Sequence, residues 1–365
     1  MSPNSKPRVI LGLMTFGPDP SAGARVTDPA ELIRAVNLLH TRGYQPVEID
    51  TARVYVGGKQ EGFTRVALED AKGEVKVATK VVYPKTGGMN GHEEVVKSVE
   101  TSLGELGVDR VEVLYLHAAD RSTPFTTTLR AINTLHLTRK FTHFGLSNFT
   151  AFEVAEIALT CAHNNWVRPT IYQAMYNAIT RSIEAELIPA CRRYGLDIVV
   201  YNPLAGGLFS GKIKSREMVP AEGRYSDTAG VTGRLYRGRY FRESTFKALE
   251  IVERAVEEVG GGLTMIETAL RWAVHHSALR VGGVSSTGVE EKGNDGVIVG
   301  VSSVEQLDAN LTALEKGPLP EAVVKALDEA WAVSKADTAP YWHLDVKYGY
   351  DTQKVLFGEK AKANV

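Results

Sequence analysis

Short β-branched runs alternate with longer amphipathic stretches along most of the 365-residue chain. Eight of the short runs have the length and composition of buried strands; they are residues 9–16, 47–50, 75–80, 111–117, 142–147, 170–173, 197–201 and 297–301. Apolar positions recur with helical spacing near residues 29–42, 60–72, 92–106, 126–139, 150–164, 181–194, 264–276 and 303–315. Strand and helix therefore alternate eight times, which predicts an α/β fold with parallel strands and helical crossovers.

The alternation leaves two arrangements open, because such strands either form an open doubly wound sheet or close into a barrel. Two segments interrupt the pattern: a Gly- and Arg-rich insertion at 205–242 and a polar segment at 285–296. The tail beyond residue 336 is too aromatic to be typical of a disordered end. No repeat or low-complexity linker divides the chain, so we expect residues 1–365 to form a single domain.

Charge and cysteine content narrow the class of protein. The 42 Lys and Arg residues against 43 Asp and Glu give a formal net charge of −1, so nucleic acid or an anionic membrane is not an expected partner. The polar amino terminus lacks the apolar run of a secretory signal, and only Cys161 and Cys191 occur. The apolar runs are far shorter than the roughly 20 residues of a membrane span. We therefore expect a cytoplasmic protein that acts on a small molecule, and we leave room for a homodimer.

Polar side chains close several of the predicted strands. Asp50 ends the second strand, Lys80 the third and His117 the fourth, while Tyr55 follows shortly after Asp50. In a barrel, the carboxyl ends of all strands open onto the face that carries active sites. Each residue alone also fits a structural role, such as a turn cap, a surface ion pair or a core histidine. Their conjunction at strand ends is what predicts a catalytic cluster.

Longer segments around these residues occur in a recognisable order. They are 12–17 (GLMTFG), 49–55 (IDTARVY), 79–80 (TK), 102–108 (SLGELGV), 116–117 (LH), 145–148 (GLSN), 172–177 (YQAMYN), 201–212 (YNPLAGGLFSGK) and 302–310 (SSVEQLDAN). This series resembles the aldo-keto reductases, and 201–212 with 236–241 (YRGRYF) looks most like the aflatoxin-aldehyde reductase branch. The resemblance implies a (β/α)8 TIM barrel with a long loop after the seventh strand and a carboxyl-terminal extension. It also implies reduction of an aldehyde or ketone by NADPH.

That chemistry needs four residue types for a physical reason. Hydride arriving at a carbonyl carbon leaves negative charge on the oxygen, which a donor must stabilise or protonate. By resemblance, Tyr55 is the general acid, and the Lys80 ammonium lowers the phenol pKa from its ordinary value of about 10. Asp50 keeps Lys80 charged and oriented. His117 hydrogen-bonds the carbonyl oxygen.

The resemblance also assigns the NADPH site. Ser147, Asn148 and Gln173 correspond to partners of the nicotinamide carboxamide, and Tyr201 to the ring that stacks on the nicotinamide. The turn at 202–207 would follow the pyrophosphate, and a helix start near residue 303 would surround the 2′-phosphate and adenine. The full predicted cofactor set is Met14, Asp50, Ser147, Asn148, Gln173, Tyr201, Asn202, Pro203, Leu204, Gly206, Lys212, Gly300, Ser302, Ser303, Gln306 and Asn310.

The predicted 2′-phosphate region departs from the family pattern. Many members carry a Lys-Ser pair and an Arg there, whereas this chain has residues 300–303 (GVSS) and Gln306. Arginines of the 205–242 insertion have two candidate roles, which are to supply the missing positive charge or to bind a substrate carboxylate. We name Arg224 and Arg239 as candidate substrate-binding residues, with a solvated basic loop as the alternative.

Three other motifs suggest different chemistry and fit less well. Residues 55–59 contain the Tyr-x-x-x-Lys of short-chain dehydrogenases, but their two glycines favour a loop and no Gly-rich dinucleotide motif follows the first strand. Residues 206–212 have phosphate-loop spacing, but Ile213 stands where Ser or Thr should meet magnesium. The His92-Glu93-Glu94 segment lacks a second histidine one turn later, and adjacent His275 and His276 point to different sides of a helix. No metal site is predicted.

Two function classes remain. The first is an enzyme that reduces small or dicarbonyl aldehydes. The second is a regulatory subunit similar to the potassium-channel β subunits, which share the implied fold and cofactor site but act as channel partners. The catalytic residue types occur in both, while the loop after Gly206 favours the enzyme. Turnover is the observation that separates them.

Overall fold

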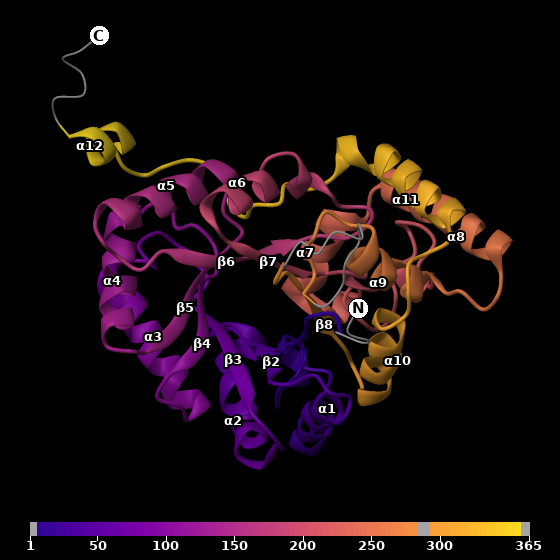
Figure 1. The fold of residues 1–365 in the computed structure, drawn as a ribbon, viewed down its shortest axis with the longest axis horizontal. Helices are drawn as coiled ribbons and strands as arrows, with labels where there is room; N and C mark the ends of the chain where they lie inside the picture. The colour runs from indigo at the N-terminus through magenta and orange to yellow at the C-terminus, as the bar shows by residue number, and fades with distance from the viewer. Residues whose placement is uncertain (1–5, 283–292, 359–365) are drawn as a thin grey trace, which may run out of the picture.

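The computed structural model describes residues 6–282 and 293–358, and its centre is a closed barrel of parallel strands (Figure 1). The strands are β1 (Val9–Gly12), β2 (Val47–Asp50), β3 (Val75–Lys80), β4 (Val111–Leu116), β5 (Phe141–Ser147), β6 (Pro169–Met175), β7 (Asp197–Tyr201) and β8 (Gly296–Gly300). Their order in space follows the sequence, and β8 pairs with β1 in the register Ile10 to Ile298. The predicted (β/α)8 barrel is confirmed, and its closure excludes the open sheet.

Helices surround the strands (Figure 1). They are α1 (Pro29–Thr41), α2 (Gln60–Asp70), α3 (His92–Leu106), α4 (Phe125–Leu137), α5 (Ala151–His163), α6 (Leu187–Tyr194), α7 (Gly230–Tyr240), α8 (Glu243–Val259), α9 (Met265–His275), α10 (Val304–Leu314), α11 (Glu321–Ser334) and α12 (Thr352–Phe357). Several begin with a side-chain cap. Asp28 accepts from Ala30 N ahead of Pro29 in α1, and Thr150 and Glu153 form a reciprocal capping box on α5.

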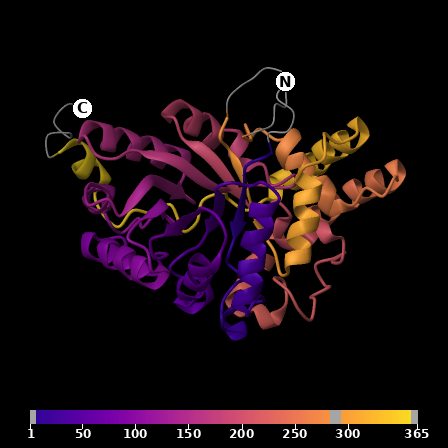
Figure 2. The same ribbon diagram turned by 60° about the horizontal axis from the view of Figure 1, so that its bottom comes forward.

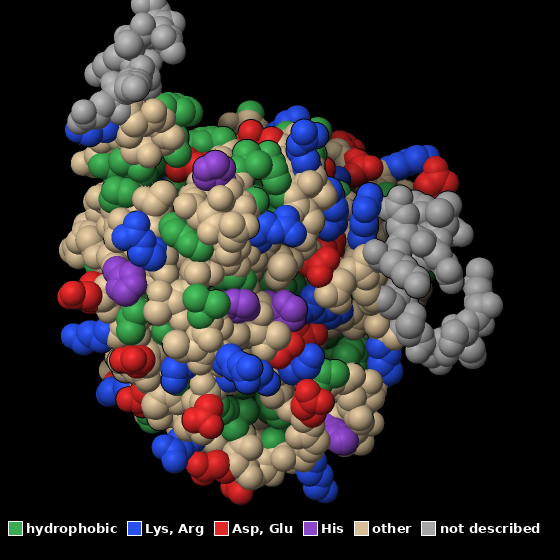
Figure 3. Space-filling model, turned by 60° about the vertical axis from the view of Figure 1, so that its left-hand side comes forward, with side chains coloured by type: hydrophobic (Ala, Val, Ile, Leu, Met, Phe, Trp, Pro, Cys, Tyr) green, Lys and Arg blue, Asp and Glu red, His purple; other side chains and the backbone are tan. Residues whose placement is uncertain are grey.

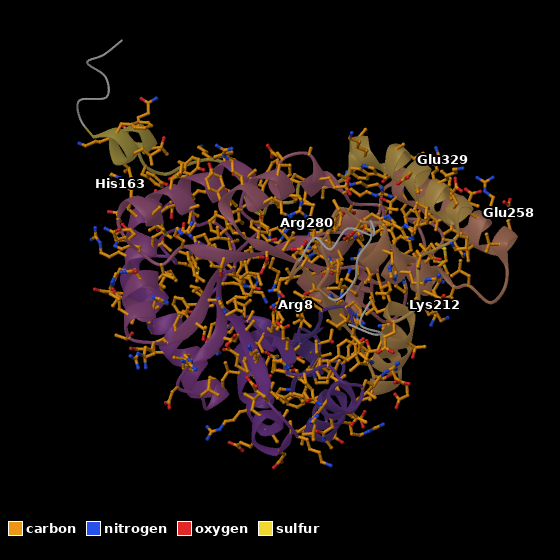
Figure 4. The ribbon with its side chains drawn as sticks, in the orientation of Figure 1. Arg8, His163, Lys212, Glu258, Arg280 and Glu329 are labelled. Atoms are coloured by element: carbon orange, nitrogen blue, oxygen red, sulfur yellow. The ribbon has the colours of Figure 1, made fainter. Side chains whose placement is uncertain are left out.

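Side chains fill the barrel, so it is a core and not a pore. A small cluster inside it comprises Ile10, Ala78, Val113, Tyr115, Ile171, Val199 and Ile298, while a much larger apolar core lies between strands and helices. The amino-terminal end is closed by ion pairs, Arg8 with Glu48 at 2.7 Å and Lys76 with Glu112 at 3.1 Å. Figure 4 labels Arg8 close to the centre of the molecule. The opposite, carboxyl end of the strands is therefore the end available for a site.

Two parts of the sequence prediction need correction. The first strand ends at Gly12 and not at Phe16, because the chain turns there and Phe16 N donates to Leu13 O at 3.0 Å. Helices α7, α8, α11 and α12 were not predicted. Glycine-rich α7 has weak intrinsic propensity, and it is held by the buried rings of Tyr236 and Tyr240.

The carboxyl-terminal extension crosses the molecule and does not fold into the barrel. Beyond α11, which packs against α8, the chain runs past α6 to the side of α5, and α12 stands out from the body (Figures 1 and 2). This agrees with the predicted extension. The predicted polar segment at 285–296 lies outside the described residues as far as residue 292, and its last residues lead into β8.

The described surface carries both signs of charge. On the face seen in Figure 3, acidic and basic side chains are interspersed. Within residues 6–282 and 293–358, no helix is long and apolar enough to cross a membrane.

Candidate active site

Asp50 and Lys80 form a buried ion pair at the carboxyl ends of β2 and β3. Lys80 Nζ lies 2.6 Å from Asp50 Oδ2 and also donates to the carbonyl oxygen of Thr51 at 2.7 Å. The Lys80 residue is only 1% exposed. A buried ammonium needs such partners, because leaving it unpaired would cost several kcal/mol. The strand register therefore brings together two charges that are 30 positions apart in sequence.

Tyr55 completes a three-way contact around the same nitrogen. Its hydroxyl lies 3.0 Å from Lys80 Nζ, and the ammonium also lies 4.9 Å from the centre of the phenol ring. Tyr55 opens a tight turn in which Val56 has φ 48° and Gly57 has φ 63°. Positive φ is strained for a β-branched residue. The turn carrying Tyr55 thus needs support from its surroundings.

Arg53 supplies that support. Its guanidinium donates to the carbonyl of Gly58 at the far end of the turn and forms an ion pair with Glu61. Glu61 is 1% exposed and accepts a 2.6 Å hydrogen bond from Thr79 Oγ1, next to Lys80 on β3. This chain of contacts ties the turn to the strand that carries Lys80. Neither Arg53 nor Glu61 was singled out from the sequence.

His117 follows β4 and faces Tyr55 edge-on. The ring centres are 6.1 Å apart, and a second tyrosine, Tyr83, lies edge-on at 5.2 Å. His117 Nδ1 is buried without a hydrogen-bond partner. Unpaired buried polar atoms are rare and often mark a ligand site. The structure thus brings Asp50, Tyr55, Lys80 and His117 together as the sequence predicts.

The surroundings of Tyr55, Lys80 and His117 shift the pKa of each of these three groups. Burial raises the pKa of Tyr55 above its ordinary value, although Lys80 acts in the opposite direction. Burial lowers the pKa of Lys80, but Asp50 and Tyr55 outweigh it and the net pKa is raised. Burial, with Lys80 and His343, holds the pKa of His117 well below its ordinary value. At neutral pH, Tyr55 is therefore protonated, Lys80 charged and His117 neutral. Lys80 thus acts on the Tyr55 pKa in the predicted direction, while burial keeps the net pKa above its ordinary value.

The residues predicted to meet a carboxamide line the neighbouring strand ends. Ser147 Oγ donates to Gln173 O at 2.9 Å, and Gln173 Nε2 donates to Asp50 Oδ1 at 2.7 Å. Asn148 has φ 63°, and its Oδ1 accepts from Tyr201 Oη at 2.8 Å. Asparagine tolerates this backbone conformation better than most residues. The four side chains thus form one network that reaches Asp50.

The turn after β7 lies beside the rings of α7. Asn202 has φ 61°, its Oδ1 accepts from Tyr236 Oη at 3.0 Å, and its Nδ2 is buried and unpaired. A Cβ on Gly206 would lie 2.7 Å from the Tyr236 ring. Pro203 is buried, and Leu204 packs partly exposed against the core. This turn is therefore shaped by α7, which the sequence pattern did not predict as a helix.

The predicted 2′-phosphate residues lie at the start of α10. Ser303 caps the helix by accepting from Gln306 N at 3.2 Å, while Ser302 N donates to Gln306 Oε1 at 3.0 Å. Asn310 is 6% exposed within the same helix. An arginine missed in the sequence completes the group, because Arg25 Nη1 from the loop after β1 lies 3.2 Å from Ser302 Oγ.

We call the loops and the tail around the carboxyl end of the barrel the rim. Other predicted cofactor residues lie farther along it. Met14 Sδ is 3.8 Å from Arg224 Nη1, and Gly300 pairs with Gly12 where β8 meets β1. Lys212 is exposed, and Figure 4 labels it away from the molecular centre. Among residues 6–282 and 293–358, the contact of Lys212 is with Ser210, away from the catalytic cluster.

Arg224 and Arg239 both lie over the ring of Tyr236, Arg239 at 5.7 Å from its centre. Arg224 donates to Tyr236 Oη at 2.8 Å and stacks over that ring at 4.9 Å. Arg239 Nη2 lies 2.6 Å from His343 Nε2. In the described part of the chain, neither guanidinium forms an ion pair with a carboxylate, and their electrostatic partners are mainly tyrosines. Half-buried cations without an acidic partner favour an anionic ligand.

The donor set fits a dinucleotide phosphate and does not suggest a metal. Within residues 6–282 and 293–358, Arg25, Arg224 and Arg239 have no carboxylate partner, and the amide nitrogen of Asn202 is unpaired; the start of α10 adds further N–H groups. Helix amino termini and guanidinium groups are typical partners of phosphates. Among the described residues, no group of three or more His, Cys, Asp or Glu is arranged to hold a metal ion.

Comparison with known proteins identifies the class of this barrel. The model of the Aldo/keto reductase family matches residues 8–332, and the chain belongs to this family. It is 40% identical to aflatoxin B1 aldehyde reductase member 2 of Mus musculus over 89% of this chain and 85% of that protein. It is 39% identical to human aldo-keto reductase family 7 member A3, over 90% and 94% respectively. The aldo-keto reductase pigE of Monascus ruber is 33% identical over 94% and 99%.

The resemblance seen in the sequence, including its aflatoxin-aldehyde reductase branch, is thereby confirmed. Membership implies an oxidoreductase that reduces carbonyl groups with NAD(P)H.

Proposed function

We propose that this protein reduces an aldehyde or ketone to an alcohol with NADPH, and that Tyr55 is the general acid. One observation carries the proposal. The Lys80 ammonium contacts both the Asp50 carboxylate and the Tyr55 hydroxyl, with His117 facing the same phenol. Names of the relatives include aldehyde reductases, which favours aldehydes as substrates.

Each of the four residues has a different role in the reaction at the carbonyl group. Bound NADPH supplies the hydride to the carbonyl carbon. Tyr55, protonated at neutral pH like any phenol, gives its proton to the oxygen as charge develops there. Lys80 stabilises the phenolate that remains, and Asp50 fixes the position of Lys80. Neutral His117 carries one N–H, which orients the carbonyl oxygen without adding charge.

The predicted cofactor residues form groups that would each hold a different part of NADPH. The network of Ser147, Asn148, Gln173 and Tyr201 would hold the nicotinamide end beside Asp50. Arg224 contacts Met14 and Tyr236, and the hydroxyl of Tyr236 donates to Asn202. This position suits binding of the cofactor diphosphate. Arg25 lies beside Ser302, which suits the 2′-phosphate. Arg25 thus offers the positive charge that the GVSS segment lacks.

Arg239 remains the candidate for the substrate. It lies 5.7 Å from the centre of the Tyr236 ring and contacts His343, whose Nδ1 lies 3.2 Å from Tyr83 Oη. Tyr83 in turn faces His117. A carboxylate on the substrate would therefore meet Arg239 while its carbonyl group faces the catalytic residues.

The wild-type protein tests the proposal in two measurements. Titration of NADPH fluorescence is expected to saturate, with tighter binding of NADPH than of NADH. An aldehyde panel is expected to show aldehyde-dependent oxidation of NADPH, with the alcohol identified by mass spectrometry. Cofactor binding without turnover on any aldehyde or ketone would favour the regulatory-subunit alternative. Equal affinity for both cofactors would refute the 2′-phosphate site.

A further inference from the structure

The turn that carries Tyr55 and the strand that carries Lys80 are joined on both faces of β3. On the site face, the Tyr55 hydroxyl lies 3.0 Å from Lys80 Nζ. Successive side chains of a strand point to opposite faces, so Thr79 faces α2. There Glu61 accepts a 2.6 Å hydrogen bond from Thr79 with one carboxylate oxygen and binds Arg53 with the other. We call Arg53, Glu61 and Thr79 the brace.

The turn itself has a backbone that the free chain would disfavour. Val56 has φ 48°, a strained conformation for a β-branched residue, and Gly57 and Gly58 also have positive φ. Arg53 Nη2 donates to the carbonyl oxygen of Gly58. A Cβ on Gly58 would lie only 2.7 Å from that nitrogen. The guanidinium therefore occupies the space beside the last glycine of the turn and fixes its carbonyl group.

Burial makes the brace rigid. Glu61 and Thr79 are each 1% exposed, and the Arg53 side chain is 16% exposed. Charge-assisted hydrogen bonds are strong where water does not compete. The pair of Arg65 and Glu69 on the same helix is different, because its side chains are 52% and 61% exposed. Such exposed pairs contribute little, so Arg65 offers a matched control.

We propose that Arg53, Glu61 and Thr79 are positioning residues that hold the Tyr55 hydroxyl in contact with Lys80 for proton transfer. This inference rests on the proposed function, because it assigns supporting residues to the same general acid. A displacement of about 1 Å at a reacting group can lower a rate by roughly 10²-fold. The brace acts through the turn from the helix face of β3, so it tunes the acid without touching NADPH or the substrate.

The phenol of Tyr55 reports whether the brace is intact. Burial raises its pKa, and the Lys80 ammonium lowers it. The other charged or titratable groups around this phenol are Asp50, His117, Tyr201, Arg224 and Tyr236. Lys80 is in direct hydrogen-bond contact, and its effect falls with distance, so a displaced turn chiefly weakens that effect. Loss of the brace should therefore raise the pKa of Tyr55.

Replacing Thr79 tests the brace with the smallest change of shape. In Thr79→Val, the single-turnover rate of benzaldehyde reduction at saturating NADPH should fall about tenfold, the factor for one lost hydrogen bond to a charged group. The NADPH dissociation constant should stay unchanged. Oxidation of benzyl alcohol by NADP needs the phenolate, so its pH profile should move to higher pH. Thr79→Ser keeps the hydroxyl and should restore rate and profile, while Arg65→Met should match wild type.

A double-mutant cycle shows whether the brace acts through Lys80. In the Lys80→Met background, Thr79→Val should change neither the remaining rate nor the pH profile, because the contact that it supports is already lost. Arg53→Met should behave like Thr79→Val, with a larger effect, because it also frees the carbonyl group of Gly58. Additive effects in the cycle, equal losses in Thr79→Val and Thr79→Ser, or a slower rate without a shifted profile would overturn the inference.

A titration without turnover separates failure of this inference from failure of the proposed function. The protein is labelled with 3-fluorotyrosine, and the ¹⁹F signal of Tyr55 is identified by its absence in Tyr55→Phe. If wild type reduces no carbonyl compound but Thr79→Val raises the pKa of this phenol, the brace stands and the proposed reaction fails. If wild type reduces benzaldehyde and Thr79→Val changes neither the phenol pKa nor the pH profile, the brace alone fails.

Discussion

The strand-end cluster and the rim above it are built by different means. Asp50 and Lys80 stand on paired strands, so the sheet register sets their 2.6 Å contact. The rim comes from glycine-rich α7 and from a tail whose Leu344 has positive φ. Side chains hold both segments, the Arg121–Glu153 pair the tail and the buried rings of Tyr236 and Tyr240 α7. The comparison suggests that the barrel places the chemistry, whereas segments outside the strands place the groups that select ligands.

The two regions also differ in whether their cations are paired with a carboxylate. In the cluster, the cation Lys80 has its carboxylate, Asp50, in direct contact. On the rim, Arg224 and Arg239 contact tyrosines and a neutral histidine. A paired cation is complete without a ligand, while an unpaired one gains when an anion binds. We therefore expect substitutions in the cluster to change rates and substitutions on the rim to change affinities.

The largest expected effect is that of Lys80→Met. Without the ammonium, Tyr55 loses the group that stabilises its phenolate, and Asp50 and burial raise the phenol pKa further. Turnover should fall by about 10²- to 10⁴-fold, the range for impaired proton transfer. Alcohol oxidation with NADP needs the phenolate, so its rate should begin to rise only at higher pH than in wild type. A pH profile that does not move, in a folded variant, would contradict the role of Lys80.

Most of the catalytic cluster could be predicted from the sequence, because the signal for each residue lies within a single short segment. A polar residue that closes a buried β-branched run lies on the carboxyl face of any barrel, which gave Asp50, Lys80 and His117. Tyr55 was placed in the cluster by its distance from Asp50 in the sequence, but its role as the acid depended on the family resemblance, because its strained turn leaves no periodic signal. The net pKa of Tyr55 was not predictable, since it depends on how far burial outweighs Lys80.

The rim was largely invisible in the sequence. Arg25, Tyr83 and His343 come from loops or the tail, and their contacts join positions 277, 260 and 104 residues apart. No spacing rule connects such positions. The sequence named Arg224 and Arg239 together as candidate substrate-binding residues. Only the structure shows that Arg224 contacts Met14, whereas Arg239 contacts His343.

Replacing one arginine of the rim is expected to have a smaller effect than Lys80→Met. Arg224→Met should weaken NADPH and NADH alike, by about 10- to 100-fold, because both cofactors carry the diphosphate. Arg25→Met should weaken NADPH more than NADH, and by less overall, because this guanidinium is exposed. Fluorescence titrations of both cofactors at two salt concentrations provide the measurement. Should Arg224→Met leave both affinities unchanged while acidic substrates lose affinity, Arg224 belongs to the substrate pocket.

The division between chemistry and binding can be tested most directly by the rate of hydride transfer in a single turnover. Enzyme preloaded with saturating NADPH is mixed with saturating aldehyde, and NADPH absorbance is followed. In Tyr55→Phe, the rate should fall by about 10²- to 10⁴-fold, with the NADPH dissociation constant close to that of wild type. In Arg224→Met, the rate should match wild type once cofactor is saturating. A normal rate in Tyr55→Phe, or an equally large loss in Arg224→Met, would contradict the account.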